Sequence, residues 1–135
     1  MHWAEKTPCY GDIVRTKVSF YYHYGIFKDE DNIIQFGLPD NISQPAESVK
    51  VLSTDINAFL RGGELEVAVL SATEQLKRRK PDKTVEYATA KIDTGGYDIL
   101  HNNCEHFVHE CVFGEKSSSF IDDIRSSLRK KLGKD

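Results

Sequence analysis

The stretch Asn102-Asn103-Cys104-Glu105-His106-Phe107 places a cysteine at the start of a predicted helix. Four residues continue the inner stripe of that helix: Phe107, Val108, Cys111 and Val112. A helix N-terminus carries a partial positive charge and unpaired N–H groups, so a thiol there ionises more easily and an adjacent oxyanion is stabilised. If any residue here performs covalent chemistry, we expect it to be Cys104.

The composition is that of a folded globular protein, with 135 residues, 39% hydrophobic residues and a formal net charge of -3. This length favours one domain over residues 1–135. The mild negative charge gives no reason to expect a nucleic-acid partner. Three cysteines make no disulfide framework, which favours a reducing compartment. Since there is neither a secretory signal nor a window of roughly 20 apolar residues, we expect a cytoplasmic protein.

Three strands are predicted ahead of the cysteine helix. Residues 13–18 alternate β-branched and basic side chains, and residues 20–28 are dense in aromatic ones. A polar turn over 28–32 then leads into residues 33–36, which are rich in isoleucine. This pattern predicts an antiparallel hairpin.

The hairpin is expected to bring His23 and Gln35 together. Side chains alternate along a strand, and a hairpin centred near Asp29 would set these two residues directly opposite each other. Such cross-strand partners lie about 4.5–5.5 Å apart at Cβ. The glutamine amide would then touch the imidazole.

Turn and capping residues predict the remaining elements before the cysteine helix. They are a loop over 37–47, a strand over 49–52, a helix over 55–60, a strand over 64–70, a short helix after Ser71 and a helix over 82–92. Ser53 or Thr54 is expected to cap the 55–60 helix, and Ser71 with Glu74 has the spacing of a capping box.

The segment 117–135 is predicted to be an amphipathic helix with a basic face. Its basic residues include Arg125, Arg129, Lys130, Lys131 and Lys134. Two uses remain open. The apolar face can dock onto the core of the domain, or the helix can lie on an anionic membrane surface as a peripheral contact.

A cysteine nucleophile needs a base to take its proton and a third group to orient that base. Cys104, His23 and Gln35 supply these three side-chain types. Each has a structural interpretation as well, because free cysteines are often buried hydrophobes and a strand histidine often bonds a backbone carbonyl. The residues alone leave both interpretations open.

A metal site is the other reading of the histidines and cysteines near the helix start. The crowded residues are His101, Cys104, His106, His109 and Cys111. Zinc ligands usually occur as closely spaced pairs that converge on one point. Here the cysteines lie on the inner stripe and the helix histidines lie off it, so we expect no metal and no other cofactor.

Four stretches together resemble one known family. They are Gly11-Asp12-Ile13-Val14, His23-Tyr24-Gly25-Ile26-Phe27, residues 97–107 with the Asn103-Cys104-Glu105-His106-Phe107 run, and Cys111-Val112-Phe113-Gly114. In this order they resemble the lecithin:retinol acyltransferase family, which includes small phospholipase/acyltransferases. The resemblance implies an α+β fold, a circularly permuted papain-like domain. In it an antiparallel sheet packs on helices and the cysteine lies at a helix N-terminus.

The resemblance also implies roles for individual residues. Cys104 would be the nucleophile and His23 the base, while Gln35 stands where the family usually has a second histidine. The implied activity is that of a cysteine-dependent acyltransferase or phospholipase, which acts on lipid acyl esters through a Cys104 thioester. The side chains expected to contact the substrate are Tyr21, Tyr22, Tyr24 and Asn103. The alternatives are another thiol hydrolase, such as an amidase or peptidase, and a non-catalytic binding module of the same shape.

Overall fold

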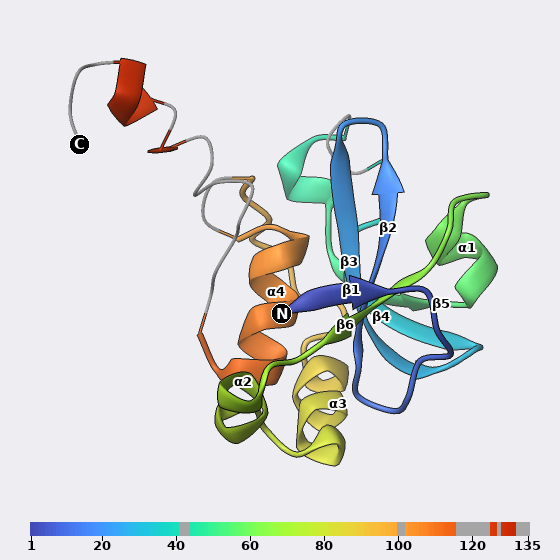
Figure 1. Cartoon of the computed structure of the whole chain (residues 1–135). Helices are drawn as coiled ribbons and strands as arrows, with labels where there is room; N and C mark the ends of the chain where they lie inside the picture. The colour runs from blue at the N-terminus through green and yellow to red at the C-terminus, as the bar shows by residue number, and fades with distance from the viewer. Residues whose placement is uncertain (41–43, 100–101, 116–124, 127, 132–135) are drawn as a thin grey trace.

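An antiparallel sheet forms the centre of the protein (Figure 1). The computed structural model describes residues 1–40, 44–99, 102–115, 125–126 and 128–131. Within these residues the six strands are β1 (His2–Ala4), β2 (Ile13–Val18), β3 (Tyr21–Asp29), β4 (Asn32–Phe36), β5 (Val51–Thr54) and β6 (Glu66–Val69). Their spatial order is β1-β6-β2-β3-β4-β5, and every neighbouring pair is antiparallel.

The helices lie on both sides of this sheet. They are the 3₁₀ turn η2 (Ala46–Ser48), α1 (Ile56–Leu60), α2 (Ala72–Lys77), α3 (Pro81–Ala90) and α4 (Cys104–Phe113). Figure 1 shows α3 and α4 on one side of the strands and α1 on the other. The fold is therefore α+β, as predicted.

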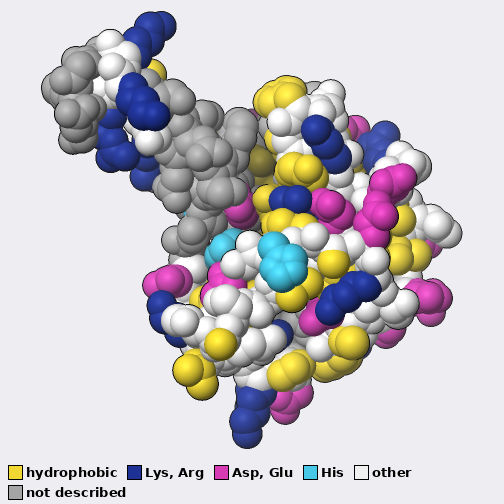
Figure 2. All heavy atoms as spheres, viewed as in Figure 1, with side chains coloured by type: hydrophobic (Ala, Val, Ile, Leu, Met, Phe, Trp, Pro, Cys, Tyr) yellow, Lys and Arg dark blue, Asp and Glu magenta, His cyan; other side chains and the backbone are white. Residues whose placement is uncertain are grey.

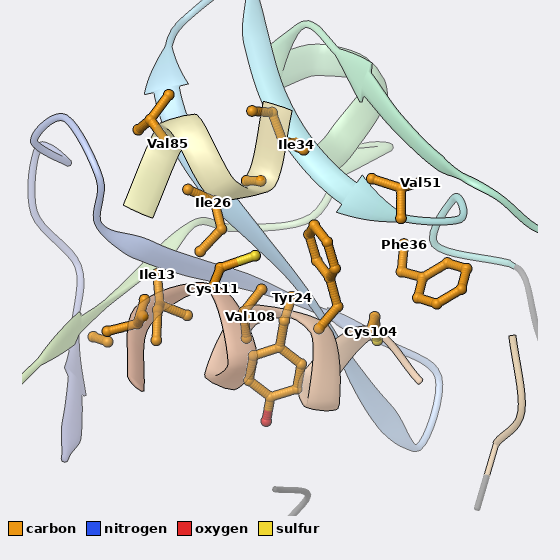
Figure 3. Packing of buried hydrophobic residues seen from close by; sticks show 14 of the residues in the cluster. Ile13, Tyr24, Ile26, Ile34, Phe36, Val51, Val85, Cys104, Val108 and Cys111 are labelled. Atoms are coloured by element: carbon orange, nitrogen blue, oxygen red, sulfur yellow. The ribbon is translucent and has the colours of Figure 1, made fainter. Parts of the chain in front are cut away.

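Two hydrophobic clusters correspond to the two faces of the sheet, because successive side chains on a strand point to opposite faces. Tyr24 and Ile26 of β3 pack in the larger cluster, together with Val108 of α4. Figure 3 shows these side chains between the sheet and the helices. Phe27 faces the other way and packs in the smaller cluster with Phe59 of α1.

Most predicted elements are confirmed, but some details differ. The capping box at the start of α2 is present, with the Ser71 hydroxyl accepting from the Glu74 N–H. The predicted cap of α1 is wrong, since the Asp55 carboxylate accepts from the Ala58 N–H in place of Ser53 or Thr54. Strand β1 was not predicted, because it is short and gains its hydrogen bonds from β6, which is distant in sequence.

The predicted register of the β3–β4 hairpin is wrong by two residues. Gln35 pairs with Gly25, so it lies diagonally across from His23. Asp29 closes the turn by accepting from Asn32 Nδ2 at 3.0 Å, and an irregularity between Phe27 and Asp29 shifts the pairing. A shift of two residues preserves the face, so His23 and Gln35 still point to the same side.

Helix α4 buries the stripe predicted from the sequence. Phe107, Val108, Cys111 and Val112 are all buried. The helix ends at Gly114, whose φ of 81° lies in the left-handed region that terminates many helices. α4 therefore packs firmly beneath the strands that carry His23 and Gln35.

The predicted C-terminal helix over 117–135 lies mostly outside the described residues. Residues 125–126 and 128–131 are helical, and Leu128 is exposed. No helix among the described parts of the chain is both long and apolar enough to cross a bilayer.

Replacing Gly25 with alanine is expected to destabilise the fold by about 1–3 kcal/mol through overpacking. A Cβ atom at this position would lie 2.8 Å from Ile33 Cγ2 and 2.9 Å from Phe59 Cε1. Urea unfolding monitored by circular dichroism measures the change. Gly95→Ala is the matched control, since its Cβ would meet only the Val49 carbonyl oxygen at 3.8 Å. Equal stability of the two variants would contradict the expectation.

Candidate active site

His23 and Gln35 form a buried pair on β3 and β4. Both side chains are fully buried, and His23 Nε2 lies 2.9 Å from Gln35 Oε1. The pairing is diagonal across the hairpin, which a long amide side chain can span. The contact predicted from the sequence is therefore present, although the register that suggested it is not.

The orientation of the Gln35 amide is fixed by two further hydrogen bonds. Its Nε2 donates to the Ile33 carbonyl oxygen at 3.0 Å and to Thr54 Oγ1 at 2.8 Å. Since the amide nitrogen is engaged there, Oε1 faces the imidazole and accepts the proton of His23 Nε2. This network assigns the tautomer of His23 in which Nε2 carries the proton and Nδ1 has a free lone pair.

His23 Nδ1 is buried and has no hydrogen-bond partner among the described residues. The rest of the ring packs against Phe59, with centroids 5.3 Å apart. Burial lowers the pKa of His23 to about 4, although the Gln35 hydrogen bond, the Gly37 backbone and the Asp40 charge all act to raise it. His23 is therefore a neutral imidazole at physiological pH.

Cys104 is the first residue of α4, directly after the capping residue Asn103. Asn103 Oδ1 accepts from the Glu105 N–H at 2.9 Å and from the His106 N–H at 3.0 Å. His106 Nδ1 accepts in return from the Asn103 N–H, which completes the capping box. The cap thus uses the N–H groups of Glu105 and His106 and does not use that of Cys104.

The thiol of Cys104 is buried, with 5% of the residue exposed. Its Sγ lies 3.9 Å from the Tyr22 carbonyl oxygen, on the strand residue that precedes His23. Burial raises the pKa of Cys104 to about 12, although the Tyr24 backbone acts to lower it. The expectation that the helix start would ease ionisation of this thiol is wrong, because desolvation of the buried thiol outweighs the backbone hydrogen bonds that favour the thiolate.

His23 is hydrogen-bonded to Gln35, whereas among the described residues no hydrogen bond links either side chain to the Cys104 thiol. His23 points to the face that carries Phe59, whereas Cys104 packs in the larger cluster with Tyr24. No hydrogen bond connects the thiol to the imidazole within the described residues. The Cys104 thiol approaches β3 at the backbone carbonyl of Tyr22, the residue before His23.

The residues expected to contact substrate lie around this point. Tyr24 is buried and packs against Trp3, with ring centroids 5.7 Å apart. Tyr22 is partly buried beneath Arg15, whose guanidinium carbon lies 3.7 Å from the ring centroid. Tyr21 is partly buried, and its hydroxyl donates to the carbonyl oxygen of Pro39. Burial and the nearby Cys104 raise the pKa of Tyr21 to about 12.

Thr54 and Asn103 make hydrogen bonds near the candidate site that the sequence alone did not predict. Thr54 lies on β5 and holds the Gln35 amide, although 19 residues separate the two in the chain. Asn103 Nδ2 donates to the Ile99 carbonyl oxygen at 2.8 Å, in addition to its capping bonds. The Asn-Cys order was a usable signal for the second of these, since asparagine is a favoured helix cap.

Comparison with known proteins identifies similar sequences. The sequence model of the lecithin retinol acyltransferase family matches residues 6–117. Lecithin retinol acyltransferase of Mus musculus is 25% identical over 144 residues, which cover 88% of this chain and 62% of the mouse protein. Phospholipase A and acyltransferase 3 of Homo sapiens is 26% identical over 127 residues, covering 87% of this chain and 78% of the human protein. The chain thus spans less than two thirds of the length of the mouse relative.

Proposed function

The chain belongs to the lecithin retinol acyltransferase family, and on that premise we propose that it cleaves or transfers lipid acyl esters through a thioester on Cys104. His23 is the base and Gln35 orients it. The names of the relatives, acyltransferase and phospholipase, support this reaction class. The substrate is a lipid or another acyl ester.

The tautomer of His23 is the observation that carries the proposal. Gln35 Oε1 accepts from Nε2, and the amide nitrogen is held by Ile33 and Thr54, so Nδ1 is left as a buried, unpartnered acceptor. A buried polar atom without a partner is costly and is often found at catalytic sites. Nδ1 is the atom that a general base needs to receive the thiol proton.

The first half-reaction begins with both groups neutral. The Cys104 S–H proton moves to His23 Nδ1 as Sγ attacks the ester carbonyl carbon, since neither group is charged beforehand. The Cys104 N–H, which the cap leaves unused, donates to the developing oxyanion. The carbon–oxygen bond then breaks, and the departing alkoxide takes the proton from the imidazolium. A thioester and a neutral alcohol result.

The second half-reaction resolves the thioester. Water, or an acceptor alcohol or amine, gives its proton to Nδ1 and attacks the thioester carbon. The carbon–sulfur bond then breaks, the imidazolium returns its proton to Sγ, and the acyl group leaves as an acid, ester or amide. Substrate binding must bring Sγ toward Nδ1, because the free protein holds the thiol against the Tyr22 carbonyl. Tyr21, Tyr22, Tyr24 and Asn103 are proposed to border the bound acyl ester.

We propose a single circularly permuted papain-like domain over 1–135, since the strand with His23 precedes the helix with Cys104 in the chain. The basic segment 117–135 would contact an anionic membrane surface. All three cysteines are free thiols, which supports a reducing, cytoplasmic environment.

Intact-mass measurement after incubation with a short-chain acyl ester tests the proposed function. The expected result is addition of one acyl group, which peptide mapping places on Cys104. Cys9→Ser serves as the starting protein, because Cys9 is exposed and would react non-specifically. An adduct confined to Cys111, or none at all, would contradict a Cys104 thioester.

The pH dependence of kcat/KM is expected to be level from about pH 5 to pH 9. Burial lowers the pKa of His23 to about 4 and raises that of Cys104 to about 12, so neither group changes its protonation in this range. Rate should rise only as pH increases through about 4, when His23 becomes neutral. A soluble ester allows the measurement, and an acid limb at the ordinary histidine value of about 6.5 would contradict this assignment.

A further inference from the structure

The turn between β2 and β3 carries an exposed aromatic side chain beside the candidate site. We propose that this turn docks on anionic phospholipid membranes by inserting Phe20 among the acyl chains. The inference rests on the proposed function, because it explains how a lipid ester would be presented to Cys104. It concerns a surface distinct from the basic segment 117–135.

Phe20 is the most exposed of the large aromatic side chains among the described residues, with 73% of its surface accessible. The preceding residue, Ser19, has a φ of 56°, in the left-handed region that reverses the chain. Figure 1 shows the turn projecting at one end of β2 and β3. Transfer of such a ring from water into hydrocarbon is favourable, and a projecting turn can make that transfer without unfolding.

The turn is tied to the neighbouring structure. Tyr21 packs edge-on against Phe20, with centroids 5.7 Å apart, and its hydroxyl bonds the carbonyl of Pro39. A groove of about 470 Å³ lies between this turn and the end of α1, with Lys17, Leu60 and Arg61 in its lining. The turn that carries Phe20 is therefore held in place by the contacts of Tyr21.

The charge around Phe20 fits an anionic surface. Lys17 is exposed, and among the described residues it has no carboxylate partner. Arg61 is half-exposed and pairs with Asp40 at 2.9 Å. Figure 2 shows hydrophobic side chains over the upper end of β2 and β3, with both basic and acidic side chains among them. Cations that flank an apolar side chain favour a membrane with anionic headgroups.

The position of the turn connects docking to chemistry. Phe20 lies directly before β3, and the Cys104 thiol contacts the carbonyl of Tyr22, two residues farther along. A bilayer that accepts Phe20 would hold its ester bonds close to this thiol. A second copy of the chain is the other occupant that an exposed aromatic turn can have, and the test separates the two.

Flotation with vesicles of phosphatidylcholine and phosphatidylglycerol at 3:1 tests the proposal, using Cys104→Ala protein so that lipid is not consumed. Phe20→Ala is expected to lower the partition coefficient by about tenfold. Leu76→Ala is the matched control, since Leu76 is 88% exposed on α2, away from the turn. Equal loss in both variants, or none for Phe20→Ala, would overturn the proposal.

A charge reversal tests the second element of the surface. Lys17→Glu is expected to weaken binding to these vesicles and to have little effect with phosphatidylcholine alone. Lys28→Glu, an exposed lysine at the other end of β3, should bind as the parent does. Equal effects of the two reversals, or sedimentation showing that Phe20→Ala disrupts a dimer without lipid, would overturn membrane docking.

Ester cleavage and vesicle binding, measured separately, distinguish a failure of membrane docking from a failure of the thioester mechanism. With Cys104 intact, Phe20→Ala should cleave a soluble short-chain ester at the parental rate. If Cys104 is acylated but Phe20→Ala still binds vesicles normally, the docking proposal fails alone. If binding depends on Phe20 while no thioester forms, the enzymatic proposal fails and docking stands.

Discussion

Replacement of Cys104 by alanine is expected to lower acyl-ester cleavage by at least about 10³-fold. Alanine removes the atom that forms the thioester, and neither His23 nor the Cys104 N–H can replace a covalent intermediate. The structural cost is small, because Cys104 is the first residue of α4 and the Asn103 cap remains intact. Release of fatty acid from a soluble ester, measured per mole of folded protein, gives the comparison.

Cys111→Ala is the matched control for this result. Cys111 is a buried cysteine on the same helix, two turns from the candidate site. Its burial raises its pKa, so it is a neutral thiol like Cys104. The control is expected to lose some stability through a small cavity and to retain its rate. If the Cys104→Ala protein releases fatty acid as fast as the parent, the thioester mechanism is wrong.

Local sequence signals predicted the elements that carry the site. The capping box at Ser71 and the apolar stripe after Cys104 act within a few residues, so their effect is visible in sequence. Strand β1 depends on pairing with β6, more than 60 residues away, and a strand of three residues has little pattern of its own. Its existence follows from tertiary contacts.

The hairpin shows why pairing is harder to predict than strand identity. Alternation correctly placed His23 and Gln35 on one face, but the turn chemistry at Asp29 set the register. The predicted contact between His23 and Gln35 is present despite the wrong register. A register error of two residues keeps both side chains on the same face, and glutamine is long enough to reach diagonally across the hairpin.

The protonation of the site depends on burial, which sequence does not report. The position of Cys104 at a helix start predicted a thiol that ionises easily, whereas the burial of this thiol raises its pKa. The same desolvation lowers the pKa of His23. Both shifts favour neutral forms, so the pair begins the reaction as thiol and imidazole.

Loss of the Gln35 amide is expected to reduce the rate by roughly 10²–10⁴-fold, because the tautomer of His23 would no longer be fixed. In Gln35→Leu the Nε2–H of His23 loses its acceptor, and Thr54 Oγ1 loses its donor. The imidazole can then carry its proton on Nδ1, where it cannot accept one from the thiol. Steady-state rates on a soluble ester measure the loss, and unfolding by urea reports the cost of the unpaired groups, about 1–3 kcal/mol.

The Gln35→His variant tests whether residue 35 acts by orienting the His23 imidazole or only by filling the buried space beside it. A neutral imidazole at this position can accept from His23 with one ring nitrogen and donate to Thr54 with the other, as the amide does. This variant is therefore expected to keep most of the activity, while Gln35→Leu loses it at comparable volume. Higher activity than the parent would mean that a ring orients the base better than an amide does. Equal loss in both variants would mean that the pocket is shaped for glutamine, and that tautomer control alone does not account for its presence.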